Sequence, residues 1–204
     1  MMVAFRNIRS LAELNTTNLP LSVLQKAKAG AKLKAAVKPK TMSKINWIDI
    51  SESITEEDIV EVERKIGLVF PSSLRKKYLM QNGGLPDCHK LYFVPPGISQ
   101  HDADEVSFRA FNPIKYRTRP KQDTLEEIYA EFVGQNLFDS TRFLPFAFDV
   151  SSFPFLMDVH TEEIHLLDRD DVDEQGNEGI KFIAKNLDAF MAGLVPWEIY
   201  EAEE

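Results

Sequence analysis

Glycines interrupt two apolar runs in close succession, first at Gly67 and then at Asn82-Gly83-Gly84. Glycine adopts the left-handed conformation at helix ends with little steric cost, so each stop is typical of a helix terminus. Proline has no backbone N–H and is best tolerated in the first turn of a helix, the place available to Pro71. The spacing therefore predicts two short helices, one ending at Gly67 and one running from Pro71 to the second stop.

The first of these helices has a clear beginning. Thr55 is a suitable N-cap, and Asp58, three residues later, can complete a capping box with it. Ile59 and Val62, together with Ile66, recur at the spacing of one buried helical face. We therefore expect an amphipathic helix that starts just after Thr55.

The second helix carries a shorter apolar face. Leu74, Tyr78 and Leu79 are expected to face the core, while Lys76 and Lys77 are expected to face water. Leu68-Val69-Phe70 is too short for a helix and connects the two helices. The two helices should therefore form a hairpin against the segments that follow.

The rest of the chain alternates extended patterns with two further helices. The helices are predicted after Asp123 or Thr124 and after Asn186, which are residues suited to N-caps. Apolar and aromatic runs between proline, glycine and polar breaks predict strands at Leu91–Val94, Val106–Phe111, Ile114–Tyr116, Phe143–Asp149, Phe155–Val159, Glu163–Leu167 and Ile180–Ala184. This order predicts an α+β fold: a twisted, mostly antiparallel sheet with helices packed on one side.

Charge divides the chain into two regions. Residues 1–44 contain nine Lys and Arg against one acid, Glu13, a net charge of +8. Residues 45–204 contain 15 basic and 31 acidic side chains, a net charge of −16. We therefore predict a basic, flexible N-terminal extension over 1–44 and a folded domain over 45–204. Other interpretations of 1–44 are an extension ahead of a start at Met42, a nucleic-acid-binding arm, a targeting peptide and a remnant of fusion.

The cysteine content and hydropathy point to a cytoplasmic protein. Cys88 is the single cysteine, which rules out an internal disulfide and fits a reducing compartment. No uninterrupted apolar run is long enough to span a bilayer. We expect no membrane span.

Two acidic segments are the strongest candidates for a binding surface. Asp168–Gly179 contains six acids and His101–Glu105 three. The first aligns poorly with a calcium loop, because Phe182 falls where a bidentate glutamate is required. The second matches no metal-site spacing. We interpret both as polar loops, with contact with a protein partner as the alternative, and predict neither metal nor cofactor.

No catalytic constellation is evident. Cys88 and His89 are adjacent, and neighbours on a strand point to opposite faces, which does not suit a nucleophile and its base. His160 and His165 can meet across a hairpin but have no third ligand. Nucleophile-elbow, phosphate-loop and paired-cysteine motifs are missing from the sequence. The sequence thus predicts a protein that is not an enzyme and has no small-molecule substrate.

The segment Ile54–Pro86 resembles the opening of the SUKH superfamily, which includes the Smi/Knr cell-wall regulators of fungi. The shared pattern comprises an acidic capped helix, Glu63 four residues before Gly67, then Pro71, Tyr78 and the Asn-Gly-Gly stop. Later segments, "FLPFAFDVSSFPFLMDV" and "KNLDAFMAGL", are also similar to the family, and the resemblance covers about residues 47–197.

This resemblance implies a binding role without catalysis. Many bacterial members are immunity proteins that neutralise toxins, often nucleases, and fungal members are scaffolds in signalling. The acidic balance of residues 45–204 then predicts a cationic protein toxin as partner, with a regulatory scaffold of the Smi/Knr type as the alternative. The predicted contact residues are Asp102, Asp104, Glu105, Asp168, Asp170, Asp171, Asp173 and Glu174.

Overall fold

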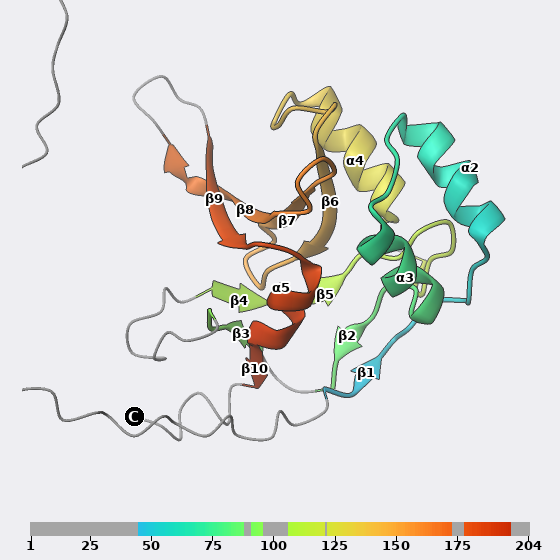
Figure 1. Ribbon diagram of the computed structural model, residues 1–204, viewed down its shortest axis with the longest axis horizontal. Coiled ribbons are helices and arrows are strands. Elements are labelled where there is room, and N and C mark those ends of the chain that lie inside the picture. Colours follow the sequence, from blue (N-terminus) through green and yellow to red (C-terminus); the bar gives the residue numbers. More distant parts are fainter. Residues whose placement is uncertain (1–44, 88–90, 96–105, 121, 173–177, 197–204) are drawn as a thin grey trace, which may run out of the picture. The chain divides into compact units, whose positions relative to one another are not determined.

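A computed structural model of the chain describes residues 45–87, 91–95, 106–120, 122–172 and 178–196, which belong to one compact unit (Figure 1). Its helices are α2 (Glu56–Ile66), α3 (Ser72–Met80), α4 (Leu125–Gly134) and α5 (Leu187–Gly193). The predicted α+β fold, with an antiparallel sheet and packed helices, is confirmed.

The strands of this unit form three sheets, and all their pairings are antiparallel. A two-stranded sheet contains β1 (Trp47–Ile48) and β2 (Leu85–Pro86). A three-stranded sheet has the order β10 (Leu194–Pro196), β3 (Leu91–Phe93), β4 (Val106–Phe108). A five-stranded meander follows sequence order: β5 (Ala110–Phe111), β6 (Phe143–Phe148), β7 (Pro154–Asp158), β8 (Ile164–Val172), β9 (Glu178–Ala184).

The strand predicted over 106–111 is divided between two sheets. The break lies at Arg109, whose N–H donates to the carbonyl of Phe148 at 2.9 Å while β4 pairs with β3 and β5 pairs with β6. The strand predicted at Ile114–Tyr116 is wrong. Lys115 has a φ of 61°, in the left-handed region, so the backbone turns sharply there instead of extending.

The capping box predicted for α2 is confirmed. The Thr55 N–H donates to the Asp58 carboxylate at 2.9 Å, and the Asp58 N–H donates to Thr55 Oγ1 at 3.3 Å. Gly67 ends the helix with a φ of 78°. These contacts satisfy N–H groups at the start of the helix that have no partner within it, and they fix where α2 begins and ends.

A buried glutamate joins α2 to α3. The Glu63 carboxylate accepts a hydrogen bond of 2.6 Å from the Phe70 N–H and one of 2.5 Å from Arg75 of α3. The glutamate four residues before Gly67 therefore holds the connector and the second helix together. Pro71 is the N-cap and not the first helical residue, so α3 begins at Ser72, one residue later than predicted.

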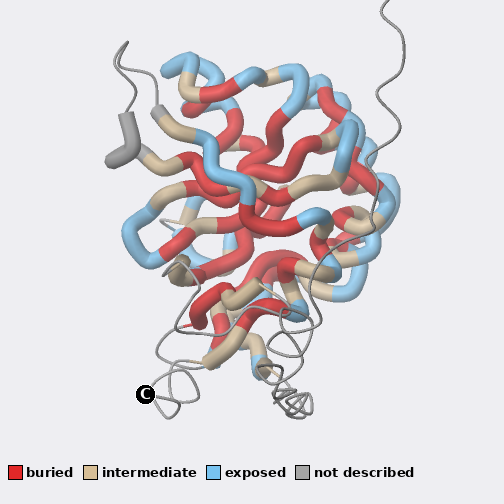
Figure 2. The backbone as a smooth tube through the Cα atoms, turned by 60° about the vertical axis from the view of Figure 1, so that its left-hand side comes forward, coloured by how far each residue is buried: buried red, intermediate tan, exposed pale blue. Residues whose placement is uncertain are grey.

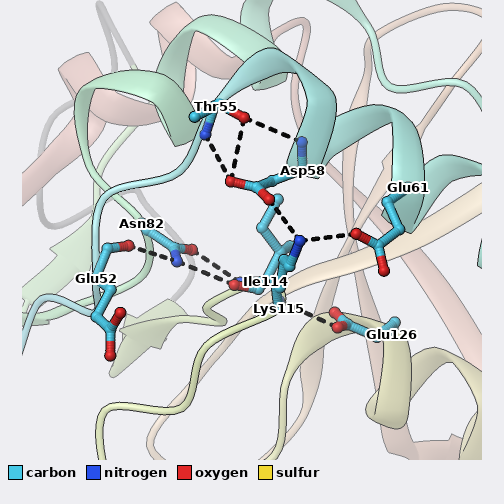
Figure 3. A network of polar contacts seen from close by, with 8 residues as sticks. All are labelled: Glu52, Thr55, Asp58, Glu61, Asn82, Ile114, Lys115 and Glu126. Atoms are coloured by element: carbon cyan, nitrogen blue, oxygen red, sulfur yellow. Dashed lines mark hydrogen bonds and ion pairs between the residues drawn. The ribbon is translucent and has the colours of Figure 1, made fainter.

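The Asn-Gly-Gly segment after α3 connects distant parts of the chain through hydrogen bonds. It does not end the helix in the left-handed conformation that was predicted. The helix ends through Gln81 in an extended conformation. Asn82, 1% exposed, donates to the carbonyls of Glu52 and Ile114, each at 3.0 Å, and accepts from the Ile114 N–H at 2.8 Å (Figure 3). Its side chain thereby replaces the strand pairing that Ile114 lacks.

The residue after Ile114 extends this network to α2 and α4. Lys115 Nζ contacts Asp58 at 2.5 Å and Glu61 at 2.7 Å, and the Lys115 N–H donates to Glu126 Oε1 at 3.1 Å (Figure 3). The hydrogen bonds that the Lys115 ammonium group donates to Asp58 and Glu61 raise the pKa of Lys115. The sharp turn at this lysine is thus held from both helices.

Aromatic side chains fill the core where the two larger sheets meet α5; Figure 2 shows buried backbone concentrated in the interior. The Phe190 ring of α5 lies 5.5 Å from that of Phe93, 5.9 Å from that of Phe108 and 5.0 Å from that of Phe155. A single helix therefore contacts both sheets through one fully buried side chain.

Two predictions about α3 are wrong. Leu79, expected to face the core, is 38% exposed, and Lys77, expected to face water, is partly buried. Its ammonium group lies over the rings of Phe111 and Trp47, 4.5 Å and 5.2 Å from their centroids, instead of facing water. Burial lowers the pKa of Lys77 to about 8. Trp47 also contacts Phe108 and Phe111, so its side chain packs the start of the described chain against the core.

Candidate partner-binding surface

The predicted acidic contact residues fall into two groups. Asp168, Asp170 and Asp171 lie in β8, next to the edge strand β9. The remaining five, Asp102, Asp104, Glu105, Asp173 and Glu174, lie outside the described residues, as do residues 1–44, Cys88, His89, His101 and Trp197. The structure therefore brings three of the eight together on one strand, and the surface as a whole stays a prediction.

The ladder between β8 and β9 is interrupted beside these acids. Asp168 pairs with Gly179 and Val172 pairs with Glu178, so residues 169–171 of β8 have no counterpart on β9. Such bulges bend a strand and redirect its residues, and they often occur at functional edges. Asp170 and Asp171 thus lie in an irregular segment of backbone at the far end of the hairpin.

Asp168 lies on the regular side of this bulge. Its carboxylate is 3.0 Å from the Nζ of Lys181 on β9, and the side chain of Lys181 is 50% exposed. An exposed partner of this kind contributes little to stability, because water and salt screen the pair. The main consequence is local: Lys181 balances much of the charge of Asp168.

A second polar cluster lies at the turn between β7 and β8, where Asp158, Glu163 and His165 offer ligand atoms within 4.8 Å of one another. The Asp158 carboxylate accepts hydrogen bonds from Arg142 Nε at 2.6 Å and from the His160 N–H at 2.8 Å. Burial alone would raise the pKa of Asp158, but these donors lower it. A cation would have to displace the arginine, so we interpret the cluster as a structural corner.

His165 in this corner is more enclosed than the surface position expected from the sequence. Its side chain is 12% exposed, and Nε2 is buried without a hydrogen-bond partner. Burial lowers the pKa of His165, which favours the neutral ring. The ring contacts Phe143 and Phe182 edge-on, at 5.5 Å and 5.9 Å between centroids.

A groove with a volume of about 610 Å³ lies between β5, β6 and α4. Ile128, Phe132 and Phe148 form its apolar floor, and its rim mixes Arg109 and Arg119 with acidic residues. Arg119 is already paired with Asp49. Because the charges of the rim are mixed, the groove does not favour a ligand of one sign, and none of the predicted contact residues lines it.

Sequence reasoning missed several residues of these sites. The exposed Ile180 and Phe182 were assigned to a strand without any sign that they face solvent. Their alternation with Lys181 was visible in the sequence, but alternation alone does not say which face is covered. Buried Glu126, whose Oε2 has no hydrogen-bond partner, was not predicted either.

A helical hairpin leading into an antiparallel meander and a closing helix defines a class of small α+β domains. The chain belongs to the SMI1 / KNR4 family (SUKH-1), whose family model matches residues 53–193. A comparison with individual curated proteins gave no match. Domains of this family are in general non-catalytic immunity or scaffold proteins.

The helices of the described residues are α2, α3, α4 and α5. None of them, in the part of the chain that the structure describes, combines the length and the apolar character needed to cross a bilayer.

Proposed function

We propose that this protein is an immunity-type member of its family, which binds and neutralises a cationic protein toxin, a nuclease, in the cytoplasm. The observation that carries the proposal is the excess of acids in residues 45–204, with a net charge of −16, and the group of aspartates at the irregular end of the β8–β9 hairpin. Family membership supports a protein partner.

Electrostatics gives this arrangement a physical role. A nuclease must present a positively charged surface to nucleic acid, and an acidic protein can occupy that surface in place of the phosphates. Complementary charge raises association rates by roughly 10- to 1,000-fold at low salt, an effect that fades as ionic strength increases. Fast capture is what protection against a toxic enzyme requires.

The proposal predicts a toxin gene directly upstream of this one, and co-expression with that toxin tests it. Changing Asp170, Asp171 and Asp173 together to lysine should abolish protection, because the surface then repels a cationic partner. The matched control changes exposed Glu52, Asp123 and Glu131 to lysine, which alters the net charge equally at other places on the surface. Equal protection by both triple variants would refute the acidic hairpin as the binding surface.

A regulatory scaffold of the Smi/Knr type is the second candidate. The observation that favours it is the +8 charge of residues 1–44, which suits contact with nucleic acid or an anionic membrane surface. Deleting residues 1–41 separates the two functions: a scaffold that acts through this arm loses activity, whereas toxin protection remains intact.

A further inference from the structure

Strand β9 forms an open edge of the five-stranded sheet. Among the described residues it pairs with β8 alone, and Figure 1 shows it at the outer side of the meander. In an antiparallel ladder alternate residues bond to the neighbouring strand, and the others direct N–H and C=O outward. The outer side of β9 is therefore a template on which another strand can pair.

The same strand exposes apolar side chains. Phe182 is 58% exposed and Ile180 is 40% exposed, and as alternate residues they project from the same face. The Phe182 ring is supported by His165, 5.9 Å away at an interplanar angle of 81°. The following residues, Ile183 and Ala184, are buried and hold β9 in place. The exposed pair thus lies on a well-anchored strand.

The charge that would normally guard such an edge is balanced. Lysines on edge strands discourage pairing with other chains. Lys181, between the two apolar residues, is 3.0 Å from the Asp168 carboxylate on β8. Residues 45–204 as a whole carry a net charge of −16. The edge as a whole therefore suits an approaching segment that is basic.

We propose that β9 is where the partner attaches: an extended segment of a cationic protein adds to it as a further strand. Its apolar side chains would pack on Ile180 and Phe182, and the net charge of −16 on residues 45–204 would attract its basic side chains. This inference rests on the proposed function and names the part of the surface that performs it. A second copy of the chain is a poorer occupant, because a net charge of −16 on residues 45–204 of each copy opposes association.

A synthetic peptide in which lysine alternates with valine serves as the probe, with the full chain as the receptor. Fluorescence anisotropy should report saturable binding, and hydrogen exchange should slow over residues 178–184 when the peptide is present. Phe182→Asp should weaken binding by about tenfold or more, since an aromatic anchor is lost. The new acid would by itself attract the lysines, so charge cannot explain this loss.

Two controls make the result decisive. Val69→Asp introduces the same acid at a side chain that is 70% exposed on the α2–α3 connector, and it should leave binding unchanged. A peptide of equal charge, with proline in place of the valines, cannot pair as a strand and should not slow exchange in β9.

Equal binding of the proline peptide, or unchanged binding by Phe182→Asp, would overturn strand addition. The charge-reversal experiment would still decide the immunity function in that event, so the two failures are distinguishable. Sedimentation of the chain alone as a dimer that Phe182→Asp dissociates would also overturn the proposal, because β9 would then be occupied by a second copy.

Discussion

Asn82→Ala tests how much of the fold depends on one side chain. The substitution removes three hydrogen bonds and leaves the Ile114 N–H buried without its partner, whereas the Ile114 carbonyl still accepts from the Tyr116 N–H at 2.6 Å. The orphaned N–H makes the free energy of unfolding fall by roughly 1–3 kcal/mol. The third partner, the carbonyl of exposed Glu52, can bond to water instead and adds little.

Urea denaturation of the full chain, followed by circular dichroism, measures this loss through the shift in midpoint at constant slope. Gln135→Ala is the matched control: it removes a side-chain bond to Glu131 on the helix surface and should change stability by less than about 0.5 kcal/mol. Asn82→Asp keeps the acceptor for the Ile114 N–H but turns a charge toward two carbonyls, so it should be at least as damaging. A loss below about 1 kcal/mol for Asn82→Ala would refute the assigned role.

Two further results follow from the same region. Gly83 and Gly67 both have positive φ, but a Cβ at Gly83 would meet Pro113 at 3.0 Å, whereas a Cβ at Gly67 would meet nothing within 4 Å. Thermal unfolding should therefore show a loss of stability of about 1–3 kcal/mol in Gly67→Ala, from backbone strain alone, and a larger loss in Gly83→Ala. Equal losses in the two variants would contradict the contact with Pro113. Burial lowers the pKa of Lys77 to about 8 from an ordinary 10.5. The unfolded chain therefore binds more protons between these values, and the free energy of unfolding should rise across that pH range in the native protein but less steeply in Lys77→Met, as denaturation at a series of pH values can measure.

Local signals in the sequence were sufficient for the helices. The capping box at Thr55 and the stop at Gly67 involve residues close together in the chain, so their outcome could be predicted without tertiary information. Asn82 behaved differently. Its short-range role as a helix stop was the natural inference, but its partners Glu52 and Ile114 are distant in sequence, and only the folded chain brings them within hydrogen-bond reach.

The candidate surface was less accessible to sequence reasoning. The acids of β8 were visible in the sequence as a cluster. The bulge beside them arises because β8 has more residues than β9 between two paired positions, and no residue type in the sequence indicates this difference. Exposure of Phe182 depends on which face of β9 is left uncovered, and that is a property of the packed sheet. Lys77 was expected to face water because it is charged. Its long aliphatic chain instead allows the ammonium group to lie over aromatic rings, and a charge pattern does not predict such a position.

The arrangement of the three-stranded sheet has a consequence for synthesis of the protein. Its central strand, β3, pairs on one side with β4 but on the other with β10, which the ribosome reaches only at residues 194–196. Until then, one side of Leu91, Tyr92 and Phe93 has no neighbour, and apolar strand edges exposed in this way promote aggregation of nascent chains. A chain that stalls before Leu194 should thus depend on chaperones, because β3 gains its second neighbour only when residues 194–196 have been made.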